Sequence, residues 1–198
     1  MTTRLYYSDI RKLEQPDFDR LIKRMPEERK KKILQRKQKK DRLRSLTAGL
    51  LLQEALKEEG LVDTSFGYDD SGKPVLFDHP EVWISITHSG DYAGILLSDR
   101  PCGIDIQEYR GMKESLIRYL LHKAEKPVTE PEKYYELFSK KEAMVKVHGF
   151  RTRFSEMDTT TPPAAYGFRS FPLEGYSFVV YAPSSVLPEL KAENRLLS

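Results

Sequence analysis

The chain has 198 residues, which suits one ordinary domain or two small domains packed together. Apolar residues make up 39% of it and aromatic residues 11%, so wholesale disorder is excluded, and no apolar run approaches the ~20 residues of a membrane-spanning helix. The formal net charge is +3, yet 13 basic and three acidic residues lie between Arg20 and Arg44. This cationic segment is a solvated helical face, a nucleic-acid patch, or a docking site for an anionic small molecule or acidic protein.

The first third of the chain predicts one strand followed by helices. Residues 4–8 are rich in aromatic side chains with polar neighbours, which favours a short strand. A helical period begins near Asp17, Pro26 starts a new helix, and a longer helix is expected over 41–59, with Gly60 ending it. The N-terminus lacks the apolar segment of a secretory signal, so we expect a cytoplasmic protein.

The middle of the chain predicts short strands separated by turns. The single cysteine, Cys102, begins the last of them, and one cysteine excludes both an intrachain disulfide and a cysteine-based zinc site. The expected strands occupy 66–68, 75–77, 82–86, 92–97 and 102–106.

The remaining chain predicts helices over 114–123 and 131–148, then an antiparallel strand pair over 165–170 and 176–181. We expect the tail after Pro183 to be loosely held. The order of elements predicts an α+β fold of two similar α/β halves that meet near residues 98–103. The corresponding division is 1–100 for the N-terminal half and 101–198 for the C-terminal half.

Asp105 and Gln107 lie two residues apart where one of these strands ends. Side chains at that spacing share a face, so both side-chain oxygens can point at one ion. Mg²⁺ prefers oxygen ligands and keeps several waters, so one or two carboxylates and a substrate phosphate suffice. Taken alone, the same pair is more typical of an ordinary solvated strand end.

Glu142 and Lys146 lie four residues apart and therefore share a helix face. An exposed ion pair would explain them. Phe138 and Val145 lie on the same face, however, which predicts partial burial, and a buried carboxylate needs a cation or metal beside it.

Two turns carry groups that suit anions. Thr-His-Ser at 87–89 combines hydroxyls, an imidazole and turn amides, which fits phosphate oxygens or a purely structural histidine. Gly-Lys-Pro at 72–74 directs a lysine toward an anion but is also common in hairpins. The chain has no dinucleotide-binding or P-loop glycine motif.

Taken in order, these segments resemble the motif series of the 4′-phosphopantetheinyl transferases. The series is Gly-Lys-Pro at 72–74, Thr-His-Ser at 87–89, Gly-Ile-Asp at 103–105 and Lys-Glu-Ala-x-x-Lys at 141–146. The resemblance is to the monomeric, two-half branch (the surfactin-synthetase-activating type), and residues 39–46 resemble that branch's helix after its basic region. It covers about residues 36–149.

The resemblance implies a pseudo-dimer of two α/β halves with coenzyme A in the cleft between them and Mg²⁺, or Mn²⁺, on its pyrophosphate. A carrier-protein serine would attack the β-phosphate, and 3′,5′-ADP would leave. Acidic acyl, peptidyl or polyketide carrier proteins are the implied partners, with no nucleic acid and no membrane.

The resemblance also implies roles for individual residues. Glu142 matches both a metal ligand and the general base, and Lys146 matches a phosphate contact that assists the leaving group. The remaining matches are Asp105 and Gln107 at the metal, and Arg29, Lys32, Arg44, Lys73, Pro74, Thr87 and His88 as coenzyme A contacts.

Two positions depart from the branch. Gln107 stands where a glutamate is usual, which removes a negative charge, although an amide oxygen still ligates a hard cation. Phe138 stands where tryptophan is usual. Gln107 supports an alternative, a degenerate relative that binds coenzyme A or an acidic partner without turnover. A nucleic-acid-binding module on the basic helices is a third hypothesis, with binding that falls steeply with salt.

Overall fold

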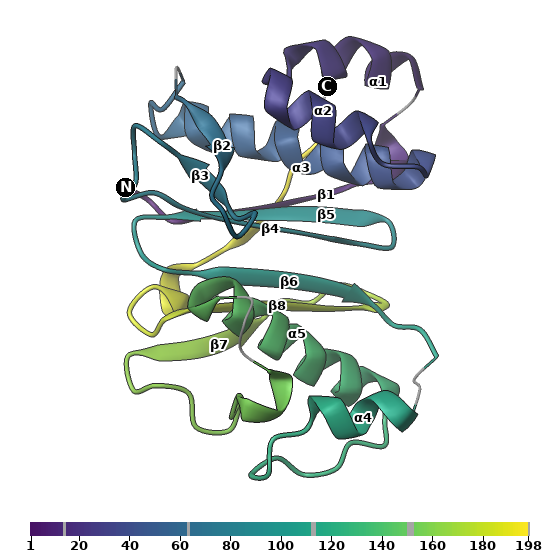
Figure 1. Cartoon of the computed structure of the whole chain (residues 1–198), viewed down its shortest axis with the longest axis vertical. Coiled ribbons are helices and arrows are strands. Elements are labelled where there is room, and N and C mark those ends of the chain that lie inside the picture. Colours follow the sequence, from purple (N-terminus) through teal and green to yellow (C-terminus); the bar gives the residue numbers. More distant parts are fainter. Residues whose placement is uncertain (14, 63, 112–113, 150–152, 198) are drawn as a thin grey trace.

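The computed structural model describes residues 1–13, 15–62, 64–111, 114–149 and 153–197. It has a mixed α+β fold with several sheets, stacked in the order helices, four-stranded sheet, three-stranded sheet, helices (Figure 1). A two-stranded hairpin completes it. None of the helices in the described ranges combines the length and apolar character needed to cross a membrane.

The four-stranded sheet has the strand order β4-β5-β1-β9, and helices cover its outer face. Its strands are β1 (Arg4–Asp9), β4 (Trp83–Ser89), β5 (Tyr92–Ser98) and β9 (Ala192–Asn194). The helical elements above it are η1 (Ile10–Lys12), α1 (Gln15–Leu21), η2 (Ile22–Arg24), α2 (Glu27–Leu34) and α3 (Lys39–Glu58), and the hairpin is β2 (Phe66–Tyr68) with β3 (Pro74–Leu76).

Helix α3 packs on this sheet because its apolar residues recur at helical spacing. Leu51 and Ala55 are completely buried against Ile84 and Ile95 of the sheet. The helix ends before Gly60, whose φ of +76° suits glycine at a helix C-terminus. The long helix predicted over 41–59 is therefore confirmed to within two residues at its start.

The three-stranded sheet has the order β6-β8-β7 and is covered on its outer face by α5. Its elements are β6 (Gly103–Glu108), β7 (Tyr166–Ser170) and β8 (Tyr176–Pro183), with α4 (Glu114–Leu120), α5 (Pro131–His148), η3 (Phe154–Glu156) and η4 (Leu187–Glu189) around them. Strands β7 and β8 pair antiparallel, as the sequence predicts.

The inner faces of the two sheets form one apolar layer. Leu5 and Leu96 of the first sheet pack against Ile104, Phe178 and Val180 of the second. Because side chains alternate along a strand, Asp105 and Val179 point the other way, toward α5.

Strands β4 and β6 meet through side chains, not through a backbone ladder. Hydroxyl groups at alternate positions of β4 accept hydrogen bonds from backbone N–H groups at alternate positions of β6. These bonds, each 3.0 Å long, join Ser85 to Ile104, Thr87 to Ile106 and Ser89 to Glu108. We call this row of contacts the hydroxyl seam.

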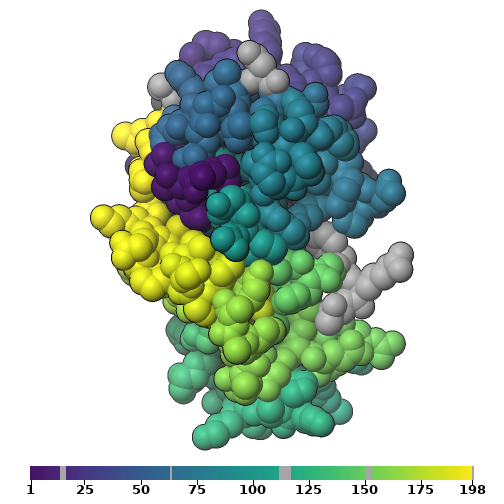
Figure 2. Space-filling model, turned by 90° about the vertical axis from the view of Figure 1, so that its left-hand side faces the viewer, coloured from purple at the N-terminus to yellow at the C-terminus, as the bar shows by residue number. Residues whose placement is uncertain are grey.

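The C-terminal tail is held, so the expectation of a loose segment after Pro183 is wrong. Strand β9 pairs in parallel with β1, which places it in the first sheet although it belongs to residues 101–198. Arg195 follows β9, forms an ion pair with Glu58 and lies over the ring of Tyr6. Figure 2 shows this segment, in yellow, against the N-terminal residues in purple.

Candidate active site

Asp105 lies on the face of β6 that points toward α5, and its carboxylate is buried. Its Oδ1 accepts hydrogen bonds from the Thr87 hydroxyl and the Lys146 ammonium, each 3.1 Å away. Its Oδ2 accepts one from the Gln107 amide nitrogen, 3.0 Å away. Three different elements therefore hold this carboxylate, namely β4, β6 and α5.

Glu142 and Lys146 approach Asp105 from α5. The Lys146 ammonium also donates to the backbone carbonyl of Ile104 at 2.5 Å. Burial raises the pKa of Glu142, and the negative charge of Asp105 raises it further, while Lys146 opposes the shift. The charge of Asp105 therefore acts on Glu142 across the contact between β6 and α5.

A close approach between α5 and β6 makes this geometry possible. A Cβ atom on Gly103 would lie 1.9 Å from the carbonyl oxygen of Ala143, so only glycine fits there. Ala143 itself is completely buried. The Gly103 and Ala143 of the two sequence motifs therefore bring the helix close enough for Glu142 and Lys146 to reach Asp105.

A cationic cavity of about 220 Å³ opens beside Lys146 and the edge of β4. Its wall brings together most of the predicted coenzyme A contacts, and no acidic side chain occurs among the described residues that line it. The lining residues are Arg29, Lys32, Arg36, Ser45, Tyr68, Gly72, Lys73, Pro74, Ile84, Ser85, Ile86, His88 and Lys146.

Aromatic rings support two of the lysines. The Lys32 ammonium lies 3.0 Å from the centre of the Tyr68 ring, and the Lys73 ammonium lies 3.3 Å from the Trp83 ring. Burial lowers the pKa of both lysines, and the charge of Arg29 contributes at Lys32. These cations are short of negative partners, so the cavity is suited to an anionic ligand.

His88 also faces this cavity. Desolvation beside the cavity wall and the positive charge of Arg44 lower the pKa of His88 to about 4, although the residue as a whole is exposed to solvent. The imidazole is therefore neutral at pH 7 in the free protein.

A second cavity, of about 350 Å³, lies beside Gln107. Lys146 lines the first cavity and Gln107 lines the second, and both donate to the Asp105 carboxylate. The second cavity is lined by Ser89, Gln107, Glu108, Arg110, Gly111, Tyr134, Tyr135 and Phe138.

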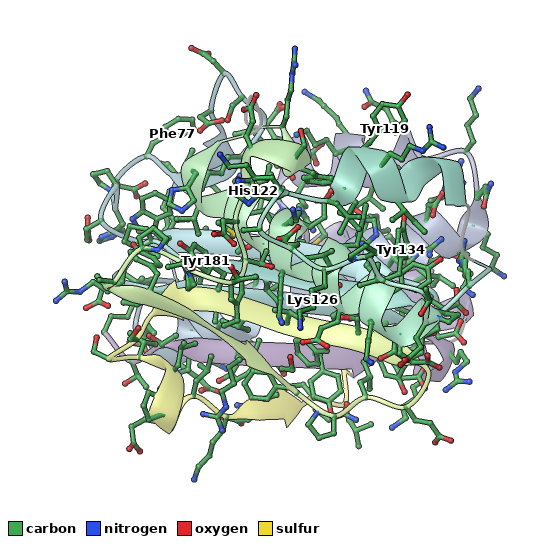
Figure 3. The ribbon with its side chains drawn as sticks, turned by 90° about the horizontal axis from the view of Figure 1, so that it is seen from below. Phe77, Tyr119, His122, Lys126, Tyr134 and Tyr181 are labelled. Atoms are coloured by element: carbon green, nitrogen blue, oxygen red, sulfur yellow. The ribbon has the colours of Figure 1, made fainter. Side chains whose placement is uncertain are left out.

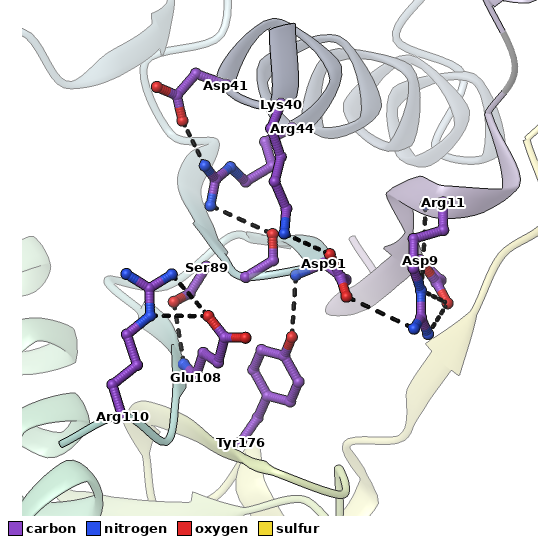
Figure 4. Close-up of polar contacts among 11 residues, drawn as sticks. Asp9, Arg11, Lys40, Asp41, Arg44, Ser89, Asp91, Glu108, Arg110 and Tyr176 are labelled. Carbon is purple, nitrogen blue, oxygen red and sulfur yellow. Dashed lines mark hydrogen bonds and ion pairs between the residues drawn. The ribbon is translucent and has the colours of Figure 1, made fainter. Parts of the chain in front are cut away.

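Two predicted contacts do not line the cationic cavity. The Thr87 hydroxyl is part of the hydroxyl seam and binds Asp105, so it points between the sheets. Arg44 pairs with Asp41 at 2.5 Å (Figure 4). It also donates to the backbone carbonyl of Gly90 at 3.3 Å. The positive charge of Arg44 nevertheless lowers the pKa of His88, which lines the cavity.

Sequence reasoning assigned no role to Tyr68 or Arg36, which both line the cationic cavity. Tyr68 pairs with Pro74 across the hairpin, and its hydroxyl accepts a hydrogen bond from Arg29 at 2.9 Å. The register of the hairpin could have predicted a role for Tyr68, because a residue opposite Pro74 lies beside Lys73.

The donors around Asp105 suit a hard divalent cation. No group of three or more His, Cys, Asp or Glu side chains with metal-site geometry occurs in the described part of the chain. Two carboxylates, an amide and a ligand phosphate are nevertheless sufficient for Mg²⁺. The mutual repulsion of Asp105 and Glu142 is the feature that such a cation would relieve.

Comparison with known proteins places the chain among named relatives. It is 27% identical over 149 residues to the 4′-phosphopantetheinyl transferase Sfp of Bacillus subtilis, an alignment that covers 70% of this chain and 66% of that protein. It is 27% identical over 127 residues to 4′-phosphopantetheinyl transferase AcpT of Salmonella typhi, covering 59% of this chain and 66% of that protein. The chain thus matches just under two thirds of the length of these relatives. No protein-family model matches the chain.

Proposed function

The chain belongs to the 4′-phosphopantetheinyl transferase superfamily, and from this premise we propose that it transfers the 4′-phosphopantetheine arm of coenzyme A to a carrier-protein serine, releasing 3′,5′-ADP. The observation that carries the proposal is the meeting of α5 and β6 beside the cationic cavity. Lys146 binds the Asp105 carboxylate there, and the charge of Asp105 helps to raise the pKa of Glu142.

The cationic cavity is the proposed site for the phosphates of coenzyme A. Arg29, Lys32 and Lys73 provide positive charge that lacks acidic partners in the cavity wall. Neutral His88 contributes a hydrogen bond or accepts a proton when the anion binds, because a nearby negative charge favours the protonated ring. The aromatic cavity beside Gln107 is the proposed approach for the pantetheine arm and the incoming serine.

In the proposed reaction the serine oxygen forms a bond to the β-phosphorus, and the bond from that phosphorus to the oxygen of the α-phosphate breaks. Glu142 accepts the serine proton, directly or through a water, and burial makes it a stronger base by raising its pKa. Lys146 neutralises charge on the departing oxygen. Asp105, Glu142 and the amide oxygen of Gln107 would hold Mg²⁺ or Mn²⁺, which supplies charge neutralisation at the pyrophosphate.

The architecture supports the proposed division into two similar halves, 1–100 and 101–198. Each half contributes a sheet with one long helix on its outer face, α3 over the first and α5 over the second, although β9 of the C-terminal half pairs with β1 in the first sheet. The proposed cleft lies where these halves meet. We propose a monomer located in the cytoplasm, with acidic carrier proteins drawn by the cations of α2 and the start of α3.

The direct test is to incubate the protein with coenzyme A, Mg²⁺ and a panel of apo carrier proteins from fatty-acid, peptide and polyketide synthesis. Mass spectrometry should detect one phosphopantetheine arm per carrier domain. We expect Glu142→Ala to abolish transfer, and Glu136→Ala, an exposed change on the same helix, to retain it. No mass gain on any carrier would count against the proposal.

Gln107 also favours a second candidate, a relative that binds coenzyme A or an acidic partner without turnover. Its amide donates to Asp105 here, and the position lacks the charge of a third carboxylate. Calorimetric binding of coenzyme A with no transfer in Mg²⁺ or Mn²⁺ would identify this function.

A further inference from the structure

Lys141 has no role in the proposed chemistry, although it directly precedes Glu142. Its side chain is completely buried, and its ammonium contacts three oxygens. These are Glu125 Oε2 at 2.6 Å and the backbone carbonyl oxygens of Phe154 and Met157, each at 2.9 Å.

Glu125, the ion-pair partner of Lys141, is also buried and hydrogen-bonded through both of its carboxylate oxygens. Its side chain is 4% exposed, and its Oε2 also accepts a hydrogen bond from the backbone N–H of His122. Its Oε1 accepts from both the N–H and the hydroxyl of Thr159. The ion pair therefore joins α5 to the loop after α4 and to the segment around η3.

These segments form the outer layer over α5. Figure 3 views this side, with His122 and Lys126 marking the loop and Tyr134 marking the helix. Lys141 lies in a stripe whose other members are apolar, including Leu137 and Met144. A leucine or methionine would fill that place without the cost of burying a charge, and a buried ion pair is weak evidence for stability.

We propose that Lys141 is a positioning residue that fixes the axial and rotational placement of α5, so that Glu142 and Lys146 meet Asp105. The inner face of α5 has its own reference point, the contact of Ala143 with Gly103. An apolar contact alone permits small shifts, whereas an ammonium with three fixed oxygen partners does not. This inference rests on the proposed function for its kinetic consequence, but not for its structural one.

The test uses Lys141→Met, the double variant Lys141→Met/Glu125→Met, and Lys140→Met as the matched control. Lys140 is the preceding lysine on α5, with an ion pair to Glu136. Lys141→Met leaves Glu125 buried and unpaired, so we expect a lower thermal midpoint. The double variant removes both charges and should regain part of that midpoint, because the backbone groups that the ion pair satisfied still lose their partners.

Kinetics separates positioning from stability. We expect kcat for carrier modification to fall at least tenfold in the double variant, while KM for coenzyme A changes less than threefold, and Lys140→Met to match the wild type. Recovery of kcat together with the thermal midpoint would overturn the proposal.

Hydrogen exchange tests the same placement without any turnover. Backbone amides over 136–148 should exchange faster in the double variant than in the wild type, even at equal thermal midpoints. Unchanged exchange there would also overturn the proposal. If the wild type modifies no carrier, the proposed function fails, and this measurement still decides the role of Lys141.

Discussion

Gln107 determines how the Asp105 carboxylate behaves without a cation. Its amide nitrogen donates to Asp105 Oδ2, so an amide suits the metal-free state better than a carboxylate does. When a cation binds, the preference is reversed. A glutamate at position 107 would add a negative charge beside the cation, whereas the Gln107 amide oxygen is uncharged. The residue at this position would therefore balance stability without a cation against affinity for the proposed metal.

We expect Gln107→Glu to preserve or raise transfer at low Mg²⁺, because a third carboxylate strengthens cation binding. Without divalent ions the variant should have a lower thermal midpoint than the wild type, since its carboxylate replaces a hydrogen-bond donor to Asp105. Mass-based transfer rates across a Mg²⁺ series and thermal unfolding in chelator check both effects. A large loss of transfer at every Mg²⁺ concentration would contradict this account.

His88 predicts a pH dependence of stability. Its pKa is lowered from 6.5 to about 4, so the folded protein binds fewer protons than the unfolded chain between these values. The contribution of His88 to the free energy of unfolding is therefore present above pH 6.5 and is lost as the pH falls toward 4. Urea unfolding of the wild type should show a steeper loss over this window than that of His88→Gln. Parallel pH profiles would show that His88 is not the responsible group.

The sequence allowed several of these residues to be located in advance. Alternation along a strand put Asp105 and Gln107 on one face, and helical spacing put Glu142 and Lys146 on another. In the structure Gln107 and Lys146 both bind the Asp105 carboxylate. The ion pair between Arg44 and Asp41 was harder to predict from the sequence. Oppositely charged residues three apart on a helix are also common where both face solvent.

At the scale of the element, the contact between α5 and β6 depends on a missing side chain. A Cβ on Gly103 of β6 would meet helix backbone, the carbonyl oxygen of Ala143. Backbone cannot move aside as a flexible side chain can, so the helix as a whole would have to shift.

We expect Gly103→Ala to lower the free energy of unfolding by at least about 1–3 kcal/mol, because it overpacks this contact. It should also reduce transfer, since the displaced helix carries Glu142 and Lys146. Gly111→Ala is the matched control, because a Cβ there meets no atom within 4 Å. Urea unfolding of both variants checks the difference, and equal stabilities would refute the steric argument.

Most elements could be predicted from the sequence because their patterns are local. Helix α5 and the β7–β8 pair agree with the periodicity and turn residues of their segments. Strand β9 could not be predicted this way, since it is short, polar and exposed, and it exists because β1 offers it a partner far away in the chain.

At the scale of the whole molecule, the hydroxyl seam joins the two sheets beside the proposed active site. Its three hydroxyls satisfy backbone N–H groups of β6 that no neighbouring strand pairs with. Thr87 belongs to both systems, because it accepts from Ile106 and donates to Asp105. The packing of one sheet on the other is therefore tied directly to the orientation of a proposed metal ligand.

Removing a hydroxyl from the seam should leave a buried N–H group without a partner. We expect Ser85→Ala and Thr87→Val each to lower the free energy of unfolding by about 1–3 kcal/mol. Ser170→Ala, an exposed change on β7, should change it by no more than about 0.5 kcal/mol. Urea unfolding measures these values, and amide exchange at Ile104 and Ile106 should quicken in the respective variants. Seam variants as stable as Ser170→Ala would show that these bonds contribute nothing.

The place of β9 beside β1 has a consequence for biosynthesis. Leu5 of β1 precedes its β9 partner Ala192 by 187 residues, so during synthesis one edge of β1 has no partner until β9 has been made. An unpaired strand edge can pair with the backbone of another nascent polypeptide. Substitutions in 192–194 should therefore increase misfolding and the need for chaperones during expression. The effect should be larger than the small buried area of these residues suggests.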